Sequence, residues 1–251
     1  MATQNTNEKS YNEPKIVKYY SEFIAAGLFR YEEQLIAKYF TAGGKTLDIG
    51  CGGCHRRIFS QLVQQLMREG KKDKAKAALD YAEKMITAAK TLNKSIDYRV
   101  GNILSAPFDA QEFDNVIFSF NGLMLIGSYE DRLFAVKEIR RLLKTDGRFI
   151  FTTPYLDNKT EKSYWIEKAE TLGIDVNNMS WEQQQQLGDE QIEDYDSKFF
   201  FHVPFVSEVK RMLKEADMEI LFSARRLDYS GIEKVEDELD DNYLWVATCK
   251  K

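Results

Sequence analysis

The chain has 251 residues, 43% of them hydrophobic and 30% charged, which is the composition of a globular protein with a sizeable core. Its formal net charge of −5 disfavours binding of nucleic acid through a broad basic face. No apolar run approaches the roughly 20 residues of a membrane span, and the first residues lack the layout of a secretory signal. We therefore expect a cytoplasmic protein, and its three cysteines predict no disulfide framework.

The first part of the chain predicts two helices followed by a strand. Apolar and aromatic side chains recur at helical spacing through residues 14–40, interrupted by Gly27. The short apolar run 45–49 then ends in Gly-Cys-Gly-Gly, a pattern typical of a buried strand that turns sharply into a helix. Residues 55–69 carry the apolar stripe of that helix.

The rest of the chain continues the alternation of strands and helices. Strands are expected at residues 96–100, 115–120, 148–152, 219–223 and 243–248, and helices at 129–143 and 205–216. Such alternation predicts an α/β fold with a mainly parallel sheet covered by helices on both faces. The polar stretch 155–201 interrupts it, and we interpret this stretch as an inserted cap.

The strongest chemical signal is the turn that follows the first predicted strand. Here Asp48 precedes the closely spaced glycines Gly50 and Gly52, with Cys51 between them. Glycines let the backbone turn tightly and approach a ligand, and the N–H groups of a following helix attract a carboxylate. This segment resembles the first motif of class I S-adenosylmethionine-dependent methyltransferases. The resemblance implies that Asp48, Gly50, Cys51 and Gly52 contact S-adenosyl-L-methionine, with Asp48 facing its ammonium group.

Later segments resemble the other motifs of the same family. Residues 79–85 resemble the second motif, which implies that Asp80, with Tyr81 beside it, accepts hydrogen bonds from the ribose hydroxyls. Residues 101–108 resemble the third, which implies that Asn102 and Ile103 read the adenine edge. Residues 113–121 resemble the fourth and end at Asn121, and residues 139–149 match the helix, turn and strand that follow.

The family resemblance implies a Rossmann-like fold with a mainly parallel seven-stranded sheet in a single methyltransferase domain. We expect residues 1–44 to form an N-terminal helical lid, 45–154 the cofactor-binding core, 155–201 the cap and 202–251 the rest of the core. We also expect Tyr20 of the lid at the cofactor.

Two departures from the family pattern affect the site. Cys54 stands where most relatives have glycine, and residues 71–90 carry an apolar stripe at helical spacing where the family needs a short strand at 75–79. We expect the strand, with Asp80 as the ribose acid. The alternative is a helical surface aspartate.

Three further features have two interpretations each. The run from Cys51 to His55 fits dithiol and haem-attachment patterns, but we expect two ordinary loop thiols and no metal site. His202 is expected to be either a structural histidine or a general base that takes a proton from the substrate. The large aromatic side chains either wall a substrate pocket or pack in the ordinary way: Tyr19, Tyr20, Tyr155, Trp165 and Trp181.

The predicted activity is transfer of a methyl group to a small-molecule acceptor by in-line displacement, a reaction that needs alignment more than covalent help from the protein. One alternative is a non-catalytic or regulatory binding protein of the same fold. Another is an NAD(P)-dependent oxidoreductase, whose G-x-G-x-x-G fingerprint would require glycine where His55 stands. We expect no membrane or nucleic-acid partner, and a homodimer remains an open alternative.

Overall fold

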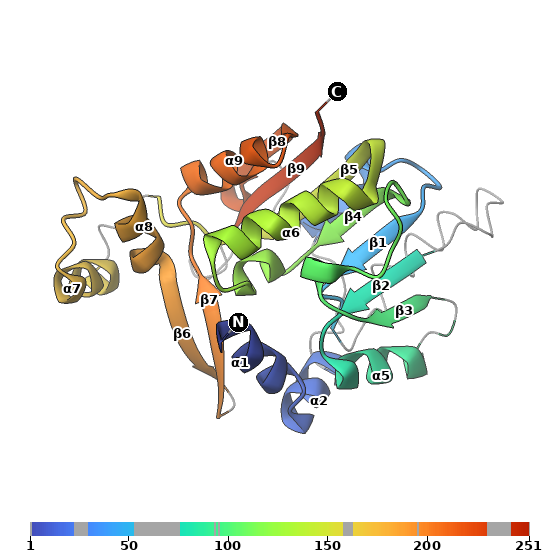
Figure 1. The fold of residues 1–251 in the computed structure, drawn as a ribbon, viewed down its shortest axis with the longest axis horizontal. Helices are drawn as coiled ribbons and strands as arrows, with labels where there is room; N and C mark the ends of the chain where they lie inside the picture. Colours follow the sequence, from blue (N-terminus) through green and yellow to red (C-terminus); the bar gives the residue numbers. More distant parts are fainter. Residues whose placement is uncertain are drawn as a thin grey trace.

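The computed structural model describes residues 2–22, 30–52, 76–92, 94, 96–157, 163–194, 196–229 and 242–250. Among these residues seven strands form one sheet in the order β3-β2-β1-β4-β5-β9-β8 (Figure 1). All neighbours from β3 to β5 pair in parallel, and β9 runs antiparallel between β5 and β8. This topology confirms the predicted Rossmann-like α/β fold.

The strands of the main sheet are short at its parallel edge and longer towards the other edge. Their bounds are β1 Thr46–Ile49, β2 Lys76–Asp80, β3 Asp97–Val100, β4 Phe113–Phe118, β5 Leu143–Thr153, β8 Met218–Arg225 and β9 Tyr243–Cys249. In the central strands successive residues enter opposite cores, because side chains alternate across a sheet. Val116 belongs to one core and Ile117 to the other.

Helices cover both faces of the sheet. On one face lie α6, Tyr129–Leu142, and α9, Val206–Glu215, whose apolar side chains share a core with β4 and β5. On the other face α3, Arg30–Tyr39, packs Tyr31, Leu35 and Ile36 against Ile117 and Ile150. Together with α2, Pro14–Glu22, these helices confirm the four expected at 14–40, 129–143 and 205–216. The predicted helix 55–69, Cys54 and His55 lie outside the described residues.

The strand β2 decides between the two interpretations of residues 71–90. Lys76–Asp80 pairs in parallel with both β1 and β3, and helix α5, Glu83–Leu92, begins only after it. Ala77, Ala78 and Leu79 are buried. A helical interpretation is therefore wrong for these five residues, because pairing on both sides overrides the local preference of so short a segment.

The region between β5 and α9 contains two helices and a two-stranded hairpin. Its elements are α7 Ser163–Leu172, α8 Trp181–Gly188, β6 Asp189–Asp194 and β7 Ser197–His202. Figure 1 shows the hairpin beside the main sheet, with the N-terminal helix α1, Ala2–Tyr11, against β7. Neither α1 nor the hairpin was expected from the sequence. In the described part of the chain, no helix has the length and apolarity needed to cross a membrane.

Candidate active site

The turn after β1 has the backbone geometry that its glycines allow. Gly50 and Gly52 have φ values of +66° and +60°, in the left-handed region that side chains disfavour. The N–H groups of Gly50 and Cys51 donate to the Leu79 carbonyl at 2.8 and 3.3 Å. A Cβ on Gly50 would lie 2.9 Å from the Phe118 ring. The turn is therefore packed against the carboxyl ends of β2 and β4.

Asp80, the last residue of β2, is bound to this turn. Its Oδ2 accepts the Gly52 N–H at 2.7 Å, and its Oδ1 accepts the Ala82 N–H at 2.8 Å. The residue is 8% exposed. Carboxylate oxygens accept hydrogen bonds, which is the chemistry that ribose hydroxyl groups require. The structure thus brings together the predicted first and second motifs.

The side chains of Asp48 and Cys51 lie on the buried side of the turn. Asp48 is 2% exposed in β1, and Cys51 packs with Ala78, Ile86 and Tyr98. Burial raises the pKa of Tyr98, and the nearby Cys51 and Asp48 raise it further. A ligand in front of the turn would therefore meet the Cys51 backbone and not its thiol.

Aromatic rings from three parts of the chain lie next to Asp80. Tyr20 of α2 lies over the glycine turn, with its Cδ1 3.9 Å from the position of a Cβ on Gly52. The Tyr11 ring packs edge-on against the rings of Tyr20, Tyr81 and Phe199, at 5.6, 6.1 and 5.0 Å between centroids. Burial raises the pKa of Tyr11 and of Tyr81, with the Asp80 charge acting in the same direction. Protonated phenols thus cover this carboxylate.

The third motif follows β3 at the same edge of the sheet. The Gly101 N–H donates to the Asp80 carbonyl at 2.9 Å, which ties the end of β3 to β2. Asn102 caps the short 3₁₀ helix η2, Ile103–Ser105, and its Oδ1 accepts the Leu104 N–H at 2.9 Å. Ile103 is 5% exposed and packs into the main core. Asn102 and Ile103 thus follow directly after the backbone contact between Gly101 and Asp80, and their role at the adenine stays a prediction.

The chain leaves β4 through a strained turn. Phe120 and Asn121 have φ values of 52° and 60°, so β4 ends at Phe118, two residues earlier than expected. The Asn121 N–H donates to Thr152 Oγ1 at 3.1 Å, and its Nδ2 donates to Asn242 Oδ1 at 3.0 Å. Its Oδ1 is buried and has no hydrogen-bond partner among the described residues. Strained residues and unpaired buried acceptors are typical of ligand sites.

His202, the predicted general base, lies at the end of β7 and is 0% exposed. Its Nδ1 is 2.7 Å from Asp189 Oδ1, and its Nε2 is 3.0 Å from Glu208 Oε2. Because carboxylates engage both ring nitrogens, the geometry favours the structural alternative. The general-base role stays a prediction that would require one of these contacts to open.

The large aromatic side chains of the cap pack in the ordinary way. Trp165 belongs to a small core shared by α7, α8 and the start of the return segment. Trp181 packs edge-on against Tyr129 of α6 at 4.9 Å, and Tyr155 packs against Tyr243 of β9 at 5.8 Å. Of the aromatic residues that the sequence singled out, the structure places Tyr20 at the glycine turn.

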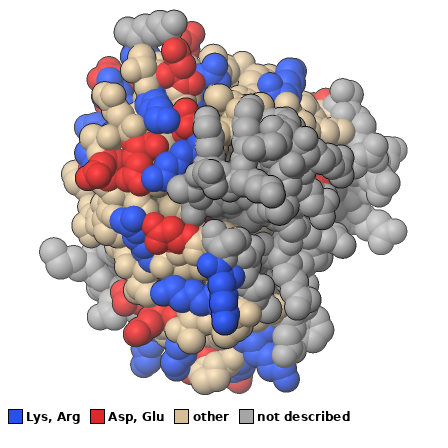
Figure 2. Space-filling model, turned by 90° about the vertical axis from the view of Figure 1, so that its right-hand side faces the viewer, with Lys and Arg blue, Asp and Glu red and all other residues tan. Residues whose placement is uncertain are grey.

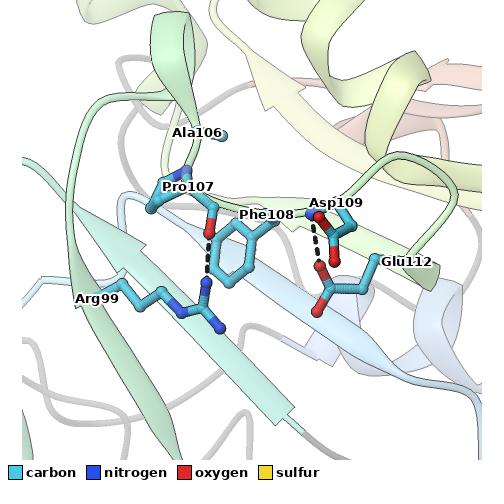
Figure 3. Close-up of a pocket in the computed structure, with 6 residues that line it drawn as sticks. All are labelled: Arg99, Ala106, Pro107, Phe108, Asp109 and Glu112. Atoms are coloured by element: carbon cyan, nitrogen blue, oxygen red, sulfur yellow. Dashed lines mark hydrogen bonds between the residues drawn. The ribbon is translucent and has the colours of Figure 1, made fainter.

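A separate pocket of ≈320 Å³ lies between β3 and the loop that precedes β4 (Figure 3). Two of the charged residues that line it, Arg99 and Glu112, already have partners. Arg99 donates to Asp97 and to the Pro107 carbonyl, and Glu112 accepts from Lys45 and from the Asp109 N–H.

Sequence reasoning missed three residues that shape the site: Tyr11, Phe118 and Asn242. Phe118 is the last residue of β4, and its position directly before the turn was the available signal. Tyr11 lies in a polar helix without apolar periodicity, so no local pattern indicates it.

The fold defines an α/β protein whose candidate ligand site lies at the carboxyl ends of β1, β2 and β4, where Rossmann-like folds bind nucleotides. Residues 47–151 match the family model of the methyltransferase domain. An uncharacterized protein of Methanocaldococcus jannaschii is 32% identical over 123 residues, which cover 48% of this chain and 41% of that protein. The chain thus matches about two fifths of the length of this curated relative.

Two solved structures show the same fold. An S-adenosylmethionine-dependent methyltransferase from Methanosarcina mazei is similar with a TM-score of 0.64 and 16% identity, over 89% of this chain and 99% of that one. The 1,6-didemethyltoxoflavin-N1-methyltransferase of Burkholderia thailandensis was solved with 1,6-didemethyltoxoflavin and S-adenosylhomocysteine. It is similar with a TM-score of 0.60 and 13% identity, over 97% of this chain and 85% of that one.

The matched segment contains all the motifs identified in the sequence from Asp48 to Asn121. Residues 47–151 thus match the methyltransferase domain that the sequence motifs predict, and the solved methyltransferases share the fold of the chain.

Proposed function

We propose that this enzyme transfers the methyl group of S-adenosylmethionine to a small-molecule acceptor by in-line displacement. The observation that carries the proposal is the contact between Asp80 and Gly52, which forms one ligand-binding edge from the ends of β1 and β2. When bound, the cofactor supplies a sulfonium-activated methyl group, and the protein supplies alignment and exclusion of water.

The residues at this edge fit the parts of the cofactor. Asp80 has oxygen acceptors for the ribose hydroxyls, with Tyr81 beside it, and Asn102 and Ile103 lie where the adenine would follow. The left-handed turn at Gly50, Cys51 and Gly52 leaves room for the methionine part, with Asp48 buried behind it. Tyr20 would cover the cofactor from the N-terminal side.

The acceptor would bind at the turn after β4. Ser119 Oγ and Asn121 Oδ1 are buried and lack hydrogen-bond partners within the described residues. Both oxygen atoms can accept a hydrogen bond. They therefore suit a methyl-accepting substrate that donates hydrogen bonds from N–H or O–H groups. His202 would take a proton from the acceptor only if one of its carboxylate contacts opened.

Two observations favour a small acceptor. The Tyr11 ring packs against Tyr20 and Phe199 and lies near Asp80, and such an aromatic environment suits a small organic acceptor. On the described part of the face in Figure 2, Lys and Arg are interspersed with Asp and Glu and form no broad basic field. The similar Burkholderia enzyme was solved with 1,6-didemethyltoxoflavin bound.

A screen for formation of S-adenosylhomocysteine tests the proposal. The purified protein is incubated with S-adenosylmethionine and with pooled small metabolites, and in parallel with bulk RNA, DNA and protein. We expect turnover with at least one small-molecule pool. Turnover with a macromolecular fraction alone would contradict the small-molecule acceptor.

A further inference from the structure

A buried asparagine joins three elements that are distant in the sequence. Asn7 of α1 is 1% exposed. Its Nδ2 donates to the carbonyls of Leu125 and Phe200 at 2.9 and 3.0 Å, and its Oδ1 accepts the Phe200 N–H at 2.7 Å. One turn later, Ser10 Oγ donates to the Lys198 carbonyl at 2.6 Å. Side chains of α1 thus bond to the backbone of β7, and Figure 1 shows α1 beside β7 on the side away from β6.

A buried arginine on α6 binds the two backbone carbonyls that follow Leu125 in the chain. Arg132 of α6 is 1% exposed, and its Nη1 donates to the carbonyls of Ile126 and Gly127 at 3.0 and 3.2 Å. Its Nη2 donates to Glu208 Oε1 at 3.1 Å, and the other oxygen of Glu208 contacts His202, the last residue of β7. Three successive carbonyls, 125 to 127, are therefore held by two buried side chains that lead to β7.

These carbonyls directly follow the strained turn of the site. Asn121 precedes the 3₁₀ helix η3, Gly122–Leu125, and a Cβ on Gly122 would lie 2.2 Å from the Phe118 ring. The same ring lies against Gly50. Because left-handed residues persist only where the surroundings fix them, the contacts that hold η3 also bear on Asn121 and Gly50.

We propose that Asn7 and Arg132 are positioning residues, which fasten the segment after η3 to strand β7 and thereby hold Asn121 on the acceptor side and, through the Phe118 ring, the Gly50 turn on the cofactor side. The inserted hairpin then serves the site through hydrogen bonds and need not touch the ligand itself. This inference rests on the proposed function, since the affinity for S-adenosylmethionine is one of its two readouts.

The first readout needs no ligand. In the free protein, Asn7→Ala should speed hydrogen exchange at the amides of Gly122, Met124 and Ile126, which bond within the turn. It should also shift the Asn121 amide resonance in protein labelled with ¹⁵N-asparagine. Ser10→Ala is the matched control, because it removes a bond from α1 to β7 without touching η3.

The second readout is the dissociation constant for S-adenosylmethionine. We expect Asn7→Ala to weaken binding about tenfold, the size expected for loss of one buried hydrogen-bonded group. Ser10→Ala should stay within about twofold of the parent protein. Arg132→Lys keeps the charge but loses the fork geometry. We expect it to speed hydrogen exchange at the same η3 amides as Asn7→Ala. Arg140→Lys, also in α6, is its control.

The outcomes separate this inference from the proposed function. The positioning role would be overturned if Asn7→Ala and Arg132→Lys both matched the Ser10→Ala protein. The match would have to hold for hydrogen exchange at η3 and for the affinity for S-adenosylmethionine. A parent protein that does not bind S-adenosylmethionine would contradict the proposed function, and the exchange comparison would still decide the link between β7 and η3. If Asn7→Ala does not fold, Arg132→Lys provides the same test.

Discussion

The Oδ2 atom of Asp80 accepts a hydrogen bond from the backbone N–H of Gly52 at 2.7 Å, although 28 positions separate the two residues. This bond connects the acid at the end of β2 to the glycine turn at the end of β1. A ligand that contacts both motifs therefore meets a surface already assembled, and the ordering cost of binding is smaller.

We expect replacement of Asp80 to weaken cofactor binding strongly. Asp80→Ala removes both the acceptor for the ribose hydroxyls and the bond to Gly52, and loss of a charged acceptor costs about 1.5–3 kcal/mol. Isothermal titration with S-adenosylmethionine measures the effect. The control is Asp97→Ala, because Asp97 begins β3 and so lies at the opposite end of the parallel strands from Asp80. Asp80→Ala protein that binds as tightly as the parent would exclude the ribose role.

We expect Gly52→Val to abolish measurable binding of S-adenosylmethionine while the domain stays folded. The added side chain would stand between the glycine turn and Tyr20, and it would disfavour the φ of +60°. Gly173→Val is a matched control for backbone strain, because Gly173 has φ +66° in the cap with nothing within 4 Å of its added Cβ. Equal loss of affinity in the two variants would show that strain, and not the ligand site, causes the effect.

The buried network at Glu208 predicts a pH dependence of stability. Burial by itself would raise the pKa of Glu208, but the contacts with His202 and the charge of Arg132 outweigh it and lower the pKa below 4.5. A lowered pKa in the folded state stabilises the protein above pH 4.5, and this contribution is lost as the pH falls through the folded-state value.

Urea unfolding of the parent and of Glu208→Gln measures that contribution. At neutral pH we expect the variant to be less stable by about 3–5 kcal/mol, because Arg132 loses its buried partner. The difference between parent and variant should shrink below pH 4.5. Glu193→Gln, in an exposed ion pair with Lys198, should differ little from the parent at any pH. A difference for Glu208→Gln that does not change with pH would contradict the assignment.

We expect the cap and the N-terminal helices to close over the ligands together. Contacts of α1 with β7, and of Tyr20 with the glycine turn, connect both parts to the site. Shielding of the reacting groups requires closure, whereas substrate entry requires opening. Hydrogen exchange should slow in residues 155–201 and 14–27 when cofactor and a true acceptor are added. Exchange that is indifferent to ligands in both segments would assign the cap another purpose, such as self-association.

The sequence predicted the main sheet well where motif and pattern agree, and the roles of the site residues stay predictions. The glycine turn, the acid after β2 and the alternating strands were all readable, because close backbone approach and strand periodicity leave residue-level signals. Strand β2 was correctly assigned against its alanine- and lysine-rich composition, which locally favours helix. Its pairing with two neighbouring strands is a tertiary effect that the family resemblance supplied and the periodicity could not.

The missed elements depend on long-range polar contacts. Helix α1 has no apolar stripe, and it lies against β7 through Asn7 and Ser10, whose partners in β7 are more than 180 residues away. Strand β6 is mostly acidic and polar, so its alternation is weak. In the sequence His202 is flanked by the apolar residues Phe201 and Val203, and only the fold brings Asp189 and Glu208 to its two nitrogens.

The most direct test of the central claim is isothermal titration of the parent protein with S-adenosylmethionine and, separately, with NADH. The account predicts saturable binding of S-adenosylmethionine at one site per chain, lost in Gly52→Val and kept in Gly173→Val, with no binding of NADH. Binding of NADH in place of S-adenosylmethionine would contradict the assignment of the glycine turn as the cofactor site. Binding of S-adenosylmethionine that Gly52→Val leaves unchanged would contradict it as well.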